Sequence, residues 1–454
     1  MFDKSTNRVI VLGLARSGRA VARLLLEQGF EVVVTDQQYP DKMDAEVEEL
    51  SDLGAAFVFG GHPLELLDGP VKFLVKNPGI PYRVPFLVAA MEQGIPIYTE
   101  IEIASWYFQG RLAAITGSNG KTTTTTLVGE MLAAEGRDPI VAGNIGTAFS
   151  GVVTRVEVDR PVVLEVSSFQ LQGTERFHPH VAAILNLYSA HLDYHGDFES
   201  YMNAKWKVFA NQTEADYAVL NYEDERLQKR ADEVAAQVLW FSTQQLPASA
   251  KGVCVESGDI VMHFNGERTV LLPVNEVALP GHHNLQNALA AIAVSWLLGA
   301  RADAIRKVLQ RFQGVEHRLE FVRTVQGVAY YNDSKSTNPT AALQALRSLK
   351  QPIVWIAGGL DRKDDYTILH DVLRERVRAA VLYGQTADDL AQVCAHCHVP
   401  AIDRVTNLGD AVTRAKELAN KGDAVLLSPA CASWDMFASF EERGRMFKEV
   451  VHRL

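Results

Sequence analysis

The chain has 454 residues, of which 47% are hydrophobic and 8% aromatic, and its formal net charge at pH 7 is -11. This length and composition are ordinary for a globular protein and correspond to about three domains. The acidic balance excludes a general nucleic-acid or anionic-membrane binder, because both need a basic surface. An anionic ligand must therefore be bound by local features such as a helix N-terminus, a lysine side chain or a metal ion.

The sequence contains no segment of the kind that exports a protein or anchors it in a membrane. Its first eight residues are mostly polar and lead straight into an apolar run at Val9, without the apolar core and small-residue cleavage site of a signal peptide. The longest apolar stretch, residues 288–300, is too short to span a bilayer and contains Ser295 and Trp296, so we predict a buried helix. We expect a cytoplasmic, monomeric protein.

The four cysteines, at positions 254, 394, 397 and 431, are too few for a disulfide framework. The segment from Cys394 to His398 has the spacing of a c-type haem attachment site, and a zinc site is a related alternative. Haem attachment requires an exported protein, which this sequence does not indicate. The simpler interpretation is a helix end and loop with two incidental thiols.

Short apolar runs alternate with helical patterns along the chain, which predicts an α/β fold with parallel sheets. We place a first domain at residues 1–99, a central domain at 100–315 and a C-terminal domain at 316–454. Helices are expected at 19–28 and directly after residues 120 and 281. The expected strands are 8–12, 31–35, 73–76, 112–115, 161–166, 181–185, 217–220, 328–331, 353–357, 380–382 and 424–427.

The strongest local signal is a glycine-containing segment between the strand at 112–115 and the next helix, which reads Gly117-Ser118-Asn119-Gly120-Lys121-Thr122-Thr123. Glycines let backbone N–H groups turn toward phosphate oxygens, and a helix N-terminus adds positive potential. Lys121 can bridge the outer phosphates of a nucleotide, and the Thr122 hydroxyl can bind magnesium. Because Ile115 replaces the first glycine of the strict Walker pattern, we predict a shortened phosphate loop; a plain tight turn is the alternative.

A second glycine-containing turn, Gly13 to Gly18, follows the first strand, and Asp36 ends the next strand. The pattern resembles a dinucleotide-binding fingerprint in which Ala15 replaces the middle glycine, and this methyl group would crowd a pyrophosphate. We therefore predict that the turn binds a nucleotide other than NAD or FAD. A purely structural turn is the other alternative.

Five residues of the central domain are candidate functional residues because of their positions in the sequence. Glu165 ends a strand downstream of the phosphate loop, where a magnesium ligand is expected. His191 could bind a metal or a phosphate, although an isolated histidine is more often structural. Lys205 lies on an amphipathic pattern and, by sequence alone, is interpreted as a surface lysine. Asn284 and Asn287 share one helix face and could contact a nucleotide or cap the helix.

Polar segments follow three strands of the third domain, at residues 332–338, 358–363 and 428–435. The charged residues Asp333 and Lys335 in one strand–helix loop are typical of a polar-ligand site. Three such loops at the carboxyl ends of strands fit the rule for ligand sites in open α/β sheets.

Together these motifs resemble those of the Mur ligase family over essentially the whole chain. The shortened phosphate loop and the segments 165–171, 332–338 and 428–435 are similar to motifs of its D-glutamate-adding members. The resemblance implies a Rossmann-like UDP-binding domain, a central P-loop ATPase-like domain and a Rossmann-like C-terminal domain that brings the amino acid. It also implies ATP-dependent addition of D-glutamate to UDP-N-acetylmuramoyl-L-alanine through an acyl phosphate, with two Mg²⁺ ions, in peptidoglycan precursor synthesis.

The resemblance also implies roles for individual residues, motif by motif. ATP would contact Gly117, Ser118, Asn119, Gly120, Lys121, Thr122, Thr123, Asn284, Asn287, Arg318, Asp333 and Lys335. The UDP-linked substrate would contact Arg16, Ser17, Asp36, Gln37, Asn77, Asn144 and His191. The magnesium ions would be held by Thr122, Glu165, His191 and Lys205, with Lys205 carrying a carbamate derived from CO₂. D-glutamate would contact Thr337, Arg362, Ser433 and Phe440, with Lys363 as the alternative to Arg362. The catalytic residues would be Lys121, His191, Lys205 and Arg318.

Three other functions are alternatives on the sequence alone. Another ligase of the same superfamily, such as folylpolyglutamate synthase, is disfavoured by the first-domain turn and the 332–338 segment. A dehydrogenase is disfavoured by Ala15. A nucleotide-gated binding protein with a degenerate ATPase is disfavoured because Lys121, Glu165, Asp333 and Lys335 are all present. The group that accepts the proton of the attacking amine stays open between His191 and a carboxylate.

Overall fold

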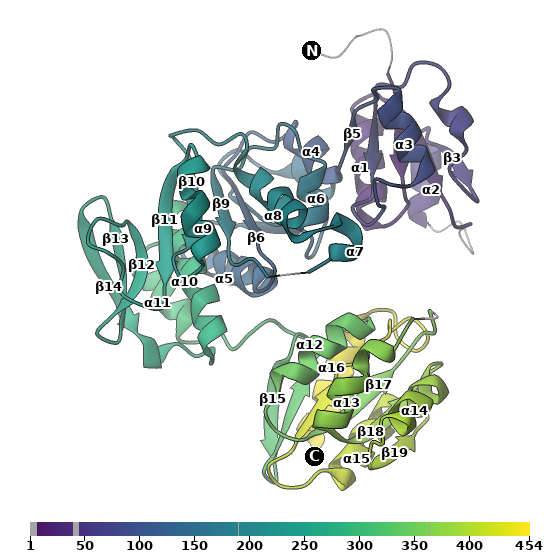
Figure 1. The fold of residues 1–454 in the computed structure, drawn as a ribbon, viewed down its shortest axis with the longest axis vertical. Coiled ribbons are helices and arrows are strands. Elements are labelled where there is room, and N and C mark those ends of the chain that lie inside the picture. Colours follow the sequence, from purple (N-terminus) through teal and green to yellow (C-terminus); the bar gives the residue numbers. More distant parts are fainter. Residues whose placement is uncertain (1–6, 40–44, 189, 363) are drawn as a thin grey trace. The chain divides into compact units, whose positions relative to one another are not determined.

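The computed structural model describes residues 7–39, 45–188, 190–362 and 364–454 (Figure 1). The chain divides into two compact units, Met1–Phe312 and Gln313–Leu454. The first unit contains two β-sheets and the second contains one, and helices alternate with the strands of all three. The predicted α/β class is thereby confirmed.

A five-stranded parallel sheet with the order β3-β2-β1-β4-β5 forms the N-terminal part of the first unit. Its strands are β1 (Arg8–Leu12), β2 (Glu31–Asp36), β3 (Ala56–Phe59), β4 (Phe73–Lys76) and β5 (Ile97–Tyr98). Its helices are α1 (Arg16–Glu27), α2 (Ala45–Asp52) and α3 (Pro85–Glu92). Helix α1 begins earlier than the predicted residue 19 and contains Gly18, where a side chain would overlap the carbonyl oxygen of Gly13.

The central sheet has nine strands in the order β14-β13-β12-β11-β10-β9-β6-β8-β7. The strands are β6 (Leu112–Thr116), β7 (Ile140–Gly143), β8 (Val162–Glu165), β9 (Val181–Ile184), β10 (Tyr217–Asn221), β11 (Gln237–Ser242), β12 (Gly252–Glu256), β13 (Asp259–Phe264) and β14 (Glu267–Pro273). The helices of this part are α4 (Glu100–Ser105), α5 (Lys121–Ala134), α6 (Ser168–Gln172), α7 (Leu192–His195), α8 (Phe198–Trp206), α9 (Glu225–Arg230), α10 (His282–Leu297) and α11 (Ala302–Leu309). Helix α10 is the predicted buried helix, with residues 287–295 inaccessible or nearly so.

Strands β12 to β14 form an antiparallel extension that the predicted strands did not include. Both of its turns have two residues with positive φ: Ser257 and Gly258 in the first, Asn265 and Gly266 in the second. Such turns match the twist of an antiparallel hairpin, and Asn-Gly is their strongest sequence signal. The Asn265-Gly266 pair could therefore have predicted the second hairpin.

The second unit is built on a six-stranded sheet with the order β15-β16-β20-β17-β18-β19. Its strands are β15 (Glu320–Val325), β16 (Val328–Asn332), β17 (Ile353–Gly358), β18 (Val377–Tyr383), β19 (Ala401–Arg404) and β20 (Ala424–Leu427). Its helices are α12 (Pro339–Ser348), α13 (His370–Arg376), α14 (Ala387–His396), α15 (Leu408–Leu418) and α16 (Phe440–Arg453). Alternate residues of β17 belong to two separate apolar clusters, because helices cover both faces of the sheet. Among the described strands of this unit, only β15 runs antiparallel to its neighbour, and it was not predicted.

All four cysteines are buried and free. Helix α14 ends at His396, which agrees with a helix end and loop at this segment. In the described ranges, neither Cys394 nor Cys397 belongs to a group of three or more side chains that could hold a metal ion. No helix in the same ranges is both long enough and apolar enough to cross a bilayer.

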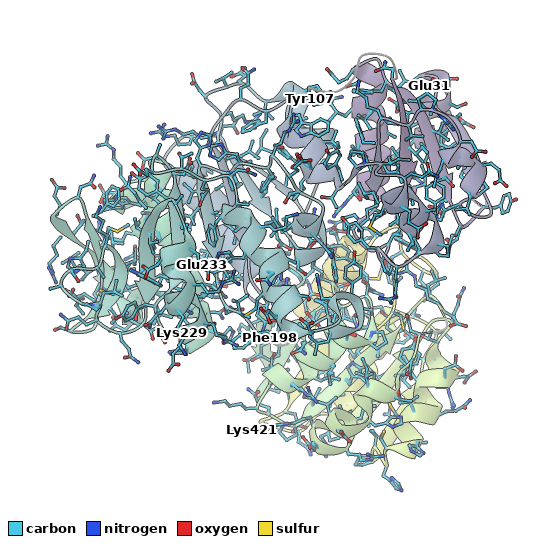
Figure 2. The ribbon with its side chains drawn as sticks, turned by 45° about the horizontal axis from the view of Figure 1, so that its top comes forward. Glu31, Tyr107, Phe198, Lys229, Glu233 and Lys421 are labelled. Atoms are coloured by element: carbon cyan, nitrogen blue, oxygen red, sulfur yellow. The ribbon has the colours of Figure 1, made fainter. Side chains whose placement is uncertain are left out.

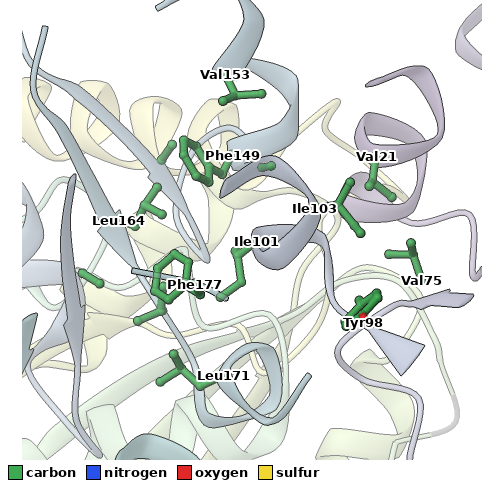
Figure 3. Packing of buried hydrophobic residues seen from close by; sticks show 14 of the residues in the cluster. Val21, Val75, Tyr98, Ile101, Ile103, Phe149, Val153, Leu164, Leu171 and Phe177 are labelled. Carbon is green, nitrogen blue, oxygen red and sulfur yellow. The ribbon is translucent and has the colours of Figure 1, made fainter. Parts of the chain in front are cut away.

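Helix α4 joins the two sheets of the first unit through a shared apolar core (Figure 3). Ile101 and Ile103 are fully buried, and they lie between Val21 and Val75 of the first sheet region and Phe177 of the central region. The two sheets of this unit are therefore covered by one continuous cluster of side chains.

Glu102, between these two isoleucines, is a fully buried carboxylate. It accepts hydrogen bonds from three successive backbone N–H groups, those of Glu175 (3.0 Å), Arg176 (2.9 Å) and Phe177 (2.9 Å). A fourth comes from the Trp106 indole N–H at 2.7 Å. These bonds compensate for burial of the charge and attach α4 to the segment that follows α6.

We predict that Glu102→Ala lowers the free energy of unfolding by about 3 kcal/mol, because buried N–H groups lose their acceptor. Urea denaturation of the full chain measures this change. Glu233→Ala is the control, since the Glu233 side chain is 50% exposed and forms a surface ion pair with Arg230; both residues lie in the part of the molecule where Figure 2 labels Glu233. That change should stay within about 0.5 kcal/mol of the parent protein. Equal stability of the two variants would contradict the role of Glu102.

Candidate active site

The predicted phosphate loop connects β6 to α5, in the expected order of strand, loop and helix. Gly117 and Gly120 both have positive φ, 153° and 83°, so each position favours glycine. A side chain at Gly120 would also overlap the side chain of Asn287 from α10. The structure thus brings Asn287 to the phosphate loop. Asn284 instead donates a hydrogen bond to the Pro280 carbonyl at 2.7 Å, and no side chain caps the N-terminus of α10 among the described residues.

Two lysine amines lie against this loop. The Lys121 amine donates hydrogen bonds to the carbonyls of Gly117 (2.9 Å) and Ser118 (3.1 Å). The Lys205 amine donates to the same Gly117 carbonyl at 2.9 Å and contacts the Thr116 hydroxyl at 3.2 Å. The loop therefore lies between a lysine from its own helix and one from α8.

The interpretation of Lys205 as a surface lysine is wrong, because its side chain is only 1% exposed. Lys205 follows Tyr201 by four residues on the buried face of α8, and its amine lies 4.9 Å from the Tyr201 ring centre. Burial lowers the pKa of Lys205 well below its usual value, and the charge of Lys121 lowers it further, while Glu165 opposes the shift. The amine is therefore neutral more readily than an ordinary lysine.

Glu165 ends β8 and is almost completely buried. One of its oxygens accepts a hydrogen bond from the Asn144 side-chain amide at 2.7 Å. The other, Oε2, is buried and has no hydrogen-bond partner among the described residues. A buried carboxylate oxygen without a donor is unfavourable unless a cation binds it. Together with the buried Thr122 hydroxyl, this donor set suits magnesium, which prefers oxygen ligands.

His191 immediately precedes α7 and has a positive φ of 57°. Its ring packs edge-on against Phe169, at a centroid distance of 4.9 Å, and Phe169 also stacks on His195. Phe169 is held by the capping box of α6, in which Ser167 and Gln170 exchange hydrogen bonds. The segment after Glu165 thus supports the position of His191.

Four of the predicted UDP-side residues lie at or beside the first glycine turn: Arg16, Ser17, Asp36 and Asn77. Asp36 accepts a hydrogen bond from the Leu14 N–H at 2.7 Å, which stabilises the turn. Arg16 donates to the carbonyl of Gly146, in the loop that carries Asn144. Ser17 and Asn77 lie together with Glu100 around a gap too small to hold a water molecule. Gln37 is exposed just after β2.

In the second unit, Asp333 joins three segments of the predicted site. It accepts hydrogen bonds from the Leu319 N–H (3.0 Å), the Ser428 hydroxyl (2.8 Å) and the Ser336 hydroxyl. Burial raises the pKa of Asp333 to about 6, although these donors and Arg318 counteract the shift. Arg318 itself is exposed.

Arg443 was missed by the sequence analysis, yet it organises two of the predicted loops. Its fully buried guanidinium donates hydrogen bonds to the Ser334 hydroxyl (3.0 Å), the Ser334 carbonyl (2.9 Å) and the Cys431 carbonyl (3.2 Å). The sequence does contain one sign that Arg443 is buried. It lies in the apolar stripe of α16, four residues before Phe447 and eight before Val451. A charged residue on a buried helix face needs such partners.

Three of the predicted D-glutamate residues lie in loops of this unit, and the fourth, Phe440, begins α16. The Phe440 carbonyl accepts from the Ser334 hydroxyl at 2.8 Å, and the Lys335 amine lies 6.0 Å from the Phe440 ring centre. Ser433 is buried, and Thr337 is half-buried beside Lys335. Arg362 is exposed and stacks on the Trp434 ring at 4.7 Å. The alternative residue, Lys363, lies outside the described residues.

Comparison with known proteins agrees with this arrangement. Family models match residues 7–99 (Mur ligase MurD-like, N-terminal domain), 115–295 (Mur ligase middle domain) and 317–431 (Mur ligase, glutamate ligase domain). The UDP-N-acetylmuramoylalanine--D-glutamate ligase of Geobacillus kaustophilus (strain HTA426) is 47% identical over 448 residues, which span 98% of each chain. The chain belongs to the Mur ligase family. The enzyme of the same name from Bacillus subtilis (strain 168) is 45% identical to this Mur ligase over 446 residues, 98% of this chain and 97% of that one.

Solved structures of other Mur ligases share the fold. The UDP-N-acetylmuramate-alanine ligase MurC of Thermotoga maritima aligns with a TM-score of 0.54 at 19% identity, covering 98% of this chain and 99% of that one. The MurF ligase of Thermotoga maritima in complex with ADP aligns with a TM-score of 0.54 at 18% identity, covering 93% and 96%. At these identities the likeness concerns the fold alone.

We predict that Lys121→Ala reduces turnover of ATP by ~100-fold or more, because a positive group at the transferring phosphate is lost. The side chain is only half-buried, so the far-UV circular dichroism and thermal midpoint should stay close to those of the parent. Lys229→Ala, at a 75% exposed lysine of α9, is the matched control and should leave turnover unchanged. Near-normal turnover in Lys121→Ala would refute the phosphate-loop role.

Proposed function

We propose that this Mur ligase uses ATP to join D-glutamate to UDP-N-acetylmuramoyl-L-alanine. Support comes from the curated relatives at 45–47% identity, whose name states this reaction and which match this chain over nearly its whole length. The structural observation that carries the proposal is the convergence of Lys121 and Lys205 on the Gly117 carbonyl, beside a glycine-lined helix N-terminus. This combination is suited to a polyphosphate in an otherwise acidic chain.

The reaction proceeds in two steps. The L-alanyl carboxylate attacks the γ-phosphorus of ATP, the bond to the β-phosphate oxygen breaks, and an acyl phosphate and ADP form. The amine of D-glutamate then attacks the acyl carbon, loses a proton, and inorganic phosphate leaves. Neither step needs a protein nucleophile, so catalysis rests on orientation and charge neutralisation. Lys121 and Arg318 supply positive charge in this proposal.

Two magnesium ions are part of the proposal, and they would neutralise the charge that develops on the transferring phosphoryl group. Glu165, Thr122, His191 and Lys205 would hold them. The unpartnered Oε2 of Glu165 and the buried Thr122 hydroxyl support two of these assignments. Lys205 contributes an oxygen ligand only as a carbamate, and its lowered pKa favours the neutral amine that reacts with CO₂.

In the second unit, Asp333, Lys335 and Arg318 are assigned to ATP, and Thr337, Arg362, Ser433 and Phe440 to D-glutamate. Support comes from Asp333 and Arg443, which hold the 332–338 and 428–435 loops in one arrangement. In the first unit, the residues assigned to the UDP-linked substrate are Arg16, Ser17, Asp36, Gln37, Asn77, Asn144 and His191. The cytoplasmic location and the monomeric state expected from the sequence stay predictions.

We predict that the purified protein releases phosphate from ATP only when UDP-N-acetylmuramoyl-L-alanine and D-glutamate are both present with magnesium. A panel of amino acids and UDP-sugar acceptors, scored by phosphate release, tests the substrate assignment. L-glutamate and UDP-N-acetylmuramate are the matched negative controls. Comparable phosphate release with a different amino acid, or none with D-glutamate, would refute the proposed reaction.

We predict that Lys205→Ala is nearly inactive and regains part of its activity in added acetate or formate, which replace the carbamate oxygens. Lys207→Ala is the matched control, because this neighbouring lysine donates its hydrogen bond away from the phosphate loop, to the Gln172 carbonyl at 2.8 Å. Its activity should not respond to added carboxylate. Full activity of Lys205→Ala without carboxylate would disprove the carbamate assignment.

A further inference from the structure

Lys76 ends β4 with its side chain only 1% exposed, and the predicted roles do not include it. Its amine donates hydrogen bonds to the carbonyls of Pro78 (3.1 Å) and Asn77 (3.3 Å) and to the Tyr194 hydroxyl (3.1 Å). Within the described ranges it forms no ion pair with a carboxylate. A buried ammonium group with only neutral partners is unfavourable for stability, and burial lowers the pKa of Lys76 to about 7.

Two tyrosines complete the surroundings of this amine. The ring centres of Tyr82 and Tyr194 lie 4.8 Å and 5.8 Å from it, within the range of cation–π attraction. The Tyr194 hydroxyl also lies within hydrogen-bond distance of the carbonyls of Pro78 (3.1 Å) and Ile80 (3.2 Å). Burial raises the pKa of Tyr194 to about 12, so the hydroxyl keeps its proton.

These contacts connect two segments that the proposed function assigns to the same substrate. The turn at residues 77–80 begins with Asn77, whose Cβ lies against Gly13 of the first glycine turn. Tyr194 belongs to α7, which begins directly after His191. Tyr82 and Tyr194 also line a cavity of about 270 Å³.

We propose that Lys76 and Tyr194 are positioning residues that hold the 77–80 turn against α7, and so set the spacing between the nucleotide end and the reacting end of the UDP-linked substrate. The inference rests on the proposed function. Lys76 does not act as a direct ligand, because three oxygen atoms of the protein already surround its amine at hydrogen-bond distance. Its contribution is to fix the carbonyls of the turn and thereby the direction of Asn77.

The test is a double-mutant cycle of Lys76→Met and Tyr194→Phe in the full chain. Each single change should raise the KM for UDP-N-acetylmuramoyl-L-alanine about tenfold, the effect of losing one charge-assisted hydrogen bond. The KM values for ATP and D-glutamate should stay within about twofold of the parent. Because both changes break the same connection, the double variant should be no worse than the more affected single variant. Lys76→Arg, which keeps the charge and the donors, should recover part of the loss.

Lys72→Met is the matched control, because Lys72 also lies over an aromatic ring, that of Phe30 at 5.5 Å, but on the other end of β4. It should leave all three KM values unchanged. If Lys76→Met fails to fold, Tyr194→Phe still tests the pair, since it removes a single oxygen atom. If the variants show an unchanged KM for the UDP-linked substrate, or an equal rise in the KM for ATP, the positioning role is overturned. Turnover by the parent protein would still uphold the proposed function in that case. No turnover by the parent protein would overturn both.

Discussion

The carbonyl oxygen of Gly117 accepts hydrogen bonds from two lysine amines, those of Lys121 and Lys205, each at 2.9 Å. Two like charges at one atom are tolerable only if one amine loses its proton or if anions surround them. The burial of Lys205 favours the first solution, and Glu165 supplies part of the second. In a chain with a net charge of -11, the positive charge at this loop then comes from Lys121, where a polyphosphate gains the most from it.

The features that the sequence predicted well are those determined by neighbouring residues. Strands β1, β4 and β20 occupy the predicted residues, because continuous apolar runs bounded by turn residues define a buried parallel strand locally. The phosphate loop is equally local, since strand, glycines and helix follow one another within fifteen residues or so. The resemblance to a family then assigned residues that no local pattern would have selected.

The features that the sequence did not predict depend on contacts between distant segments. The burial of Lys205 follows from packing α8 against the loop after β6, and an amphipathic pattern cannot say which face receives a charged residue. Arg443 is similar, because its partners at Ser334 and Cys431 come from two other loops. The carboxylate of Glu102 and the amine of Lys76 likewise find their partners across the fold. Buried charged side chains are thus the feature that the tertiary structure reveals and that the local sequence pattern does not predict.

The shared core around α4 has a consequence for how the chain is divided. The first sheet ends at Tyr98, yet Ile101, Ile103 and Ala104 supply part of the apolar cover for α1 and β4. A fragment cut at residue 99 would lose that cover and expose Val21 and Val75 to water, which favours self-association. A truncated protein that keeps the nucleotide turn intact must therefore retain α4 and the segment to which Glu102 attaches it, although these residues follow the last strand of the sheet.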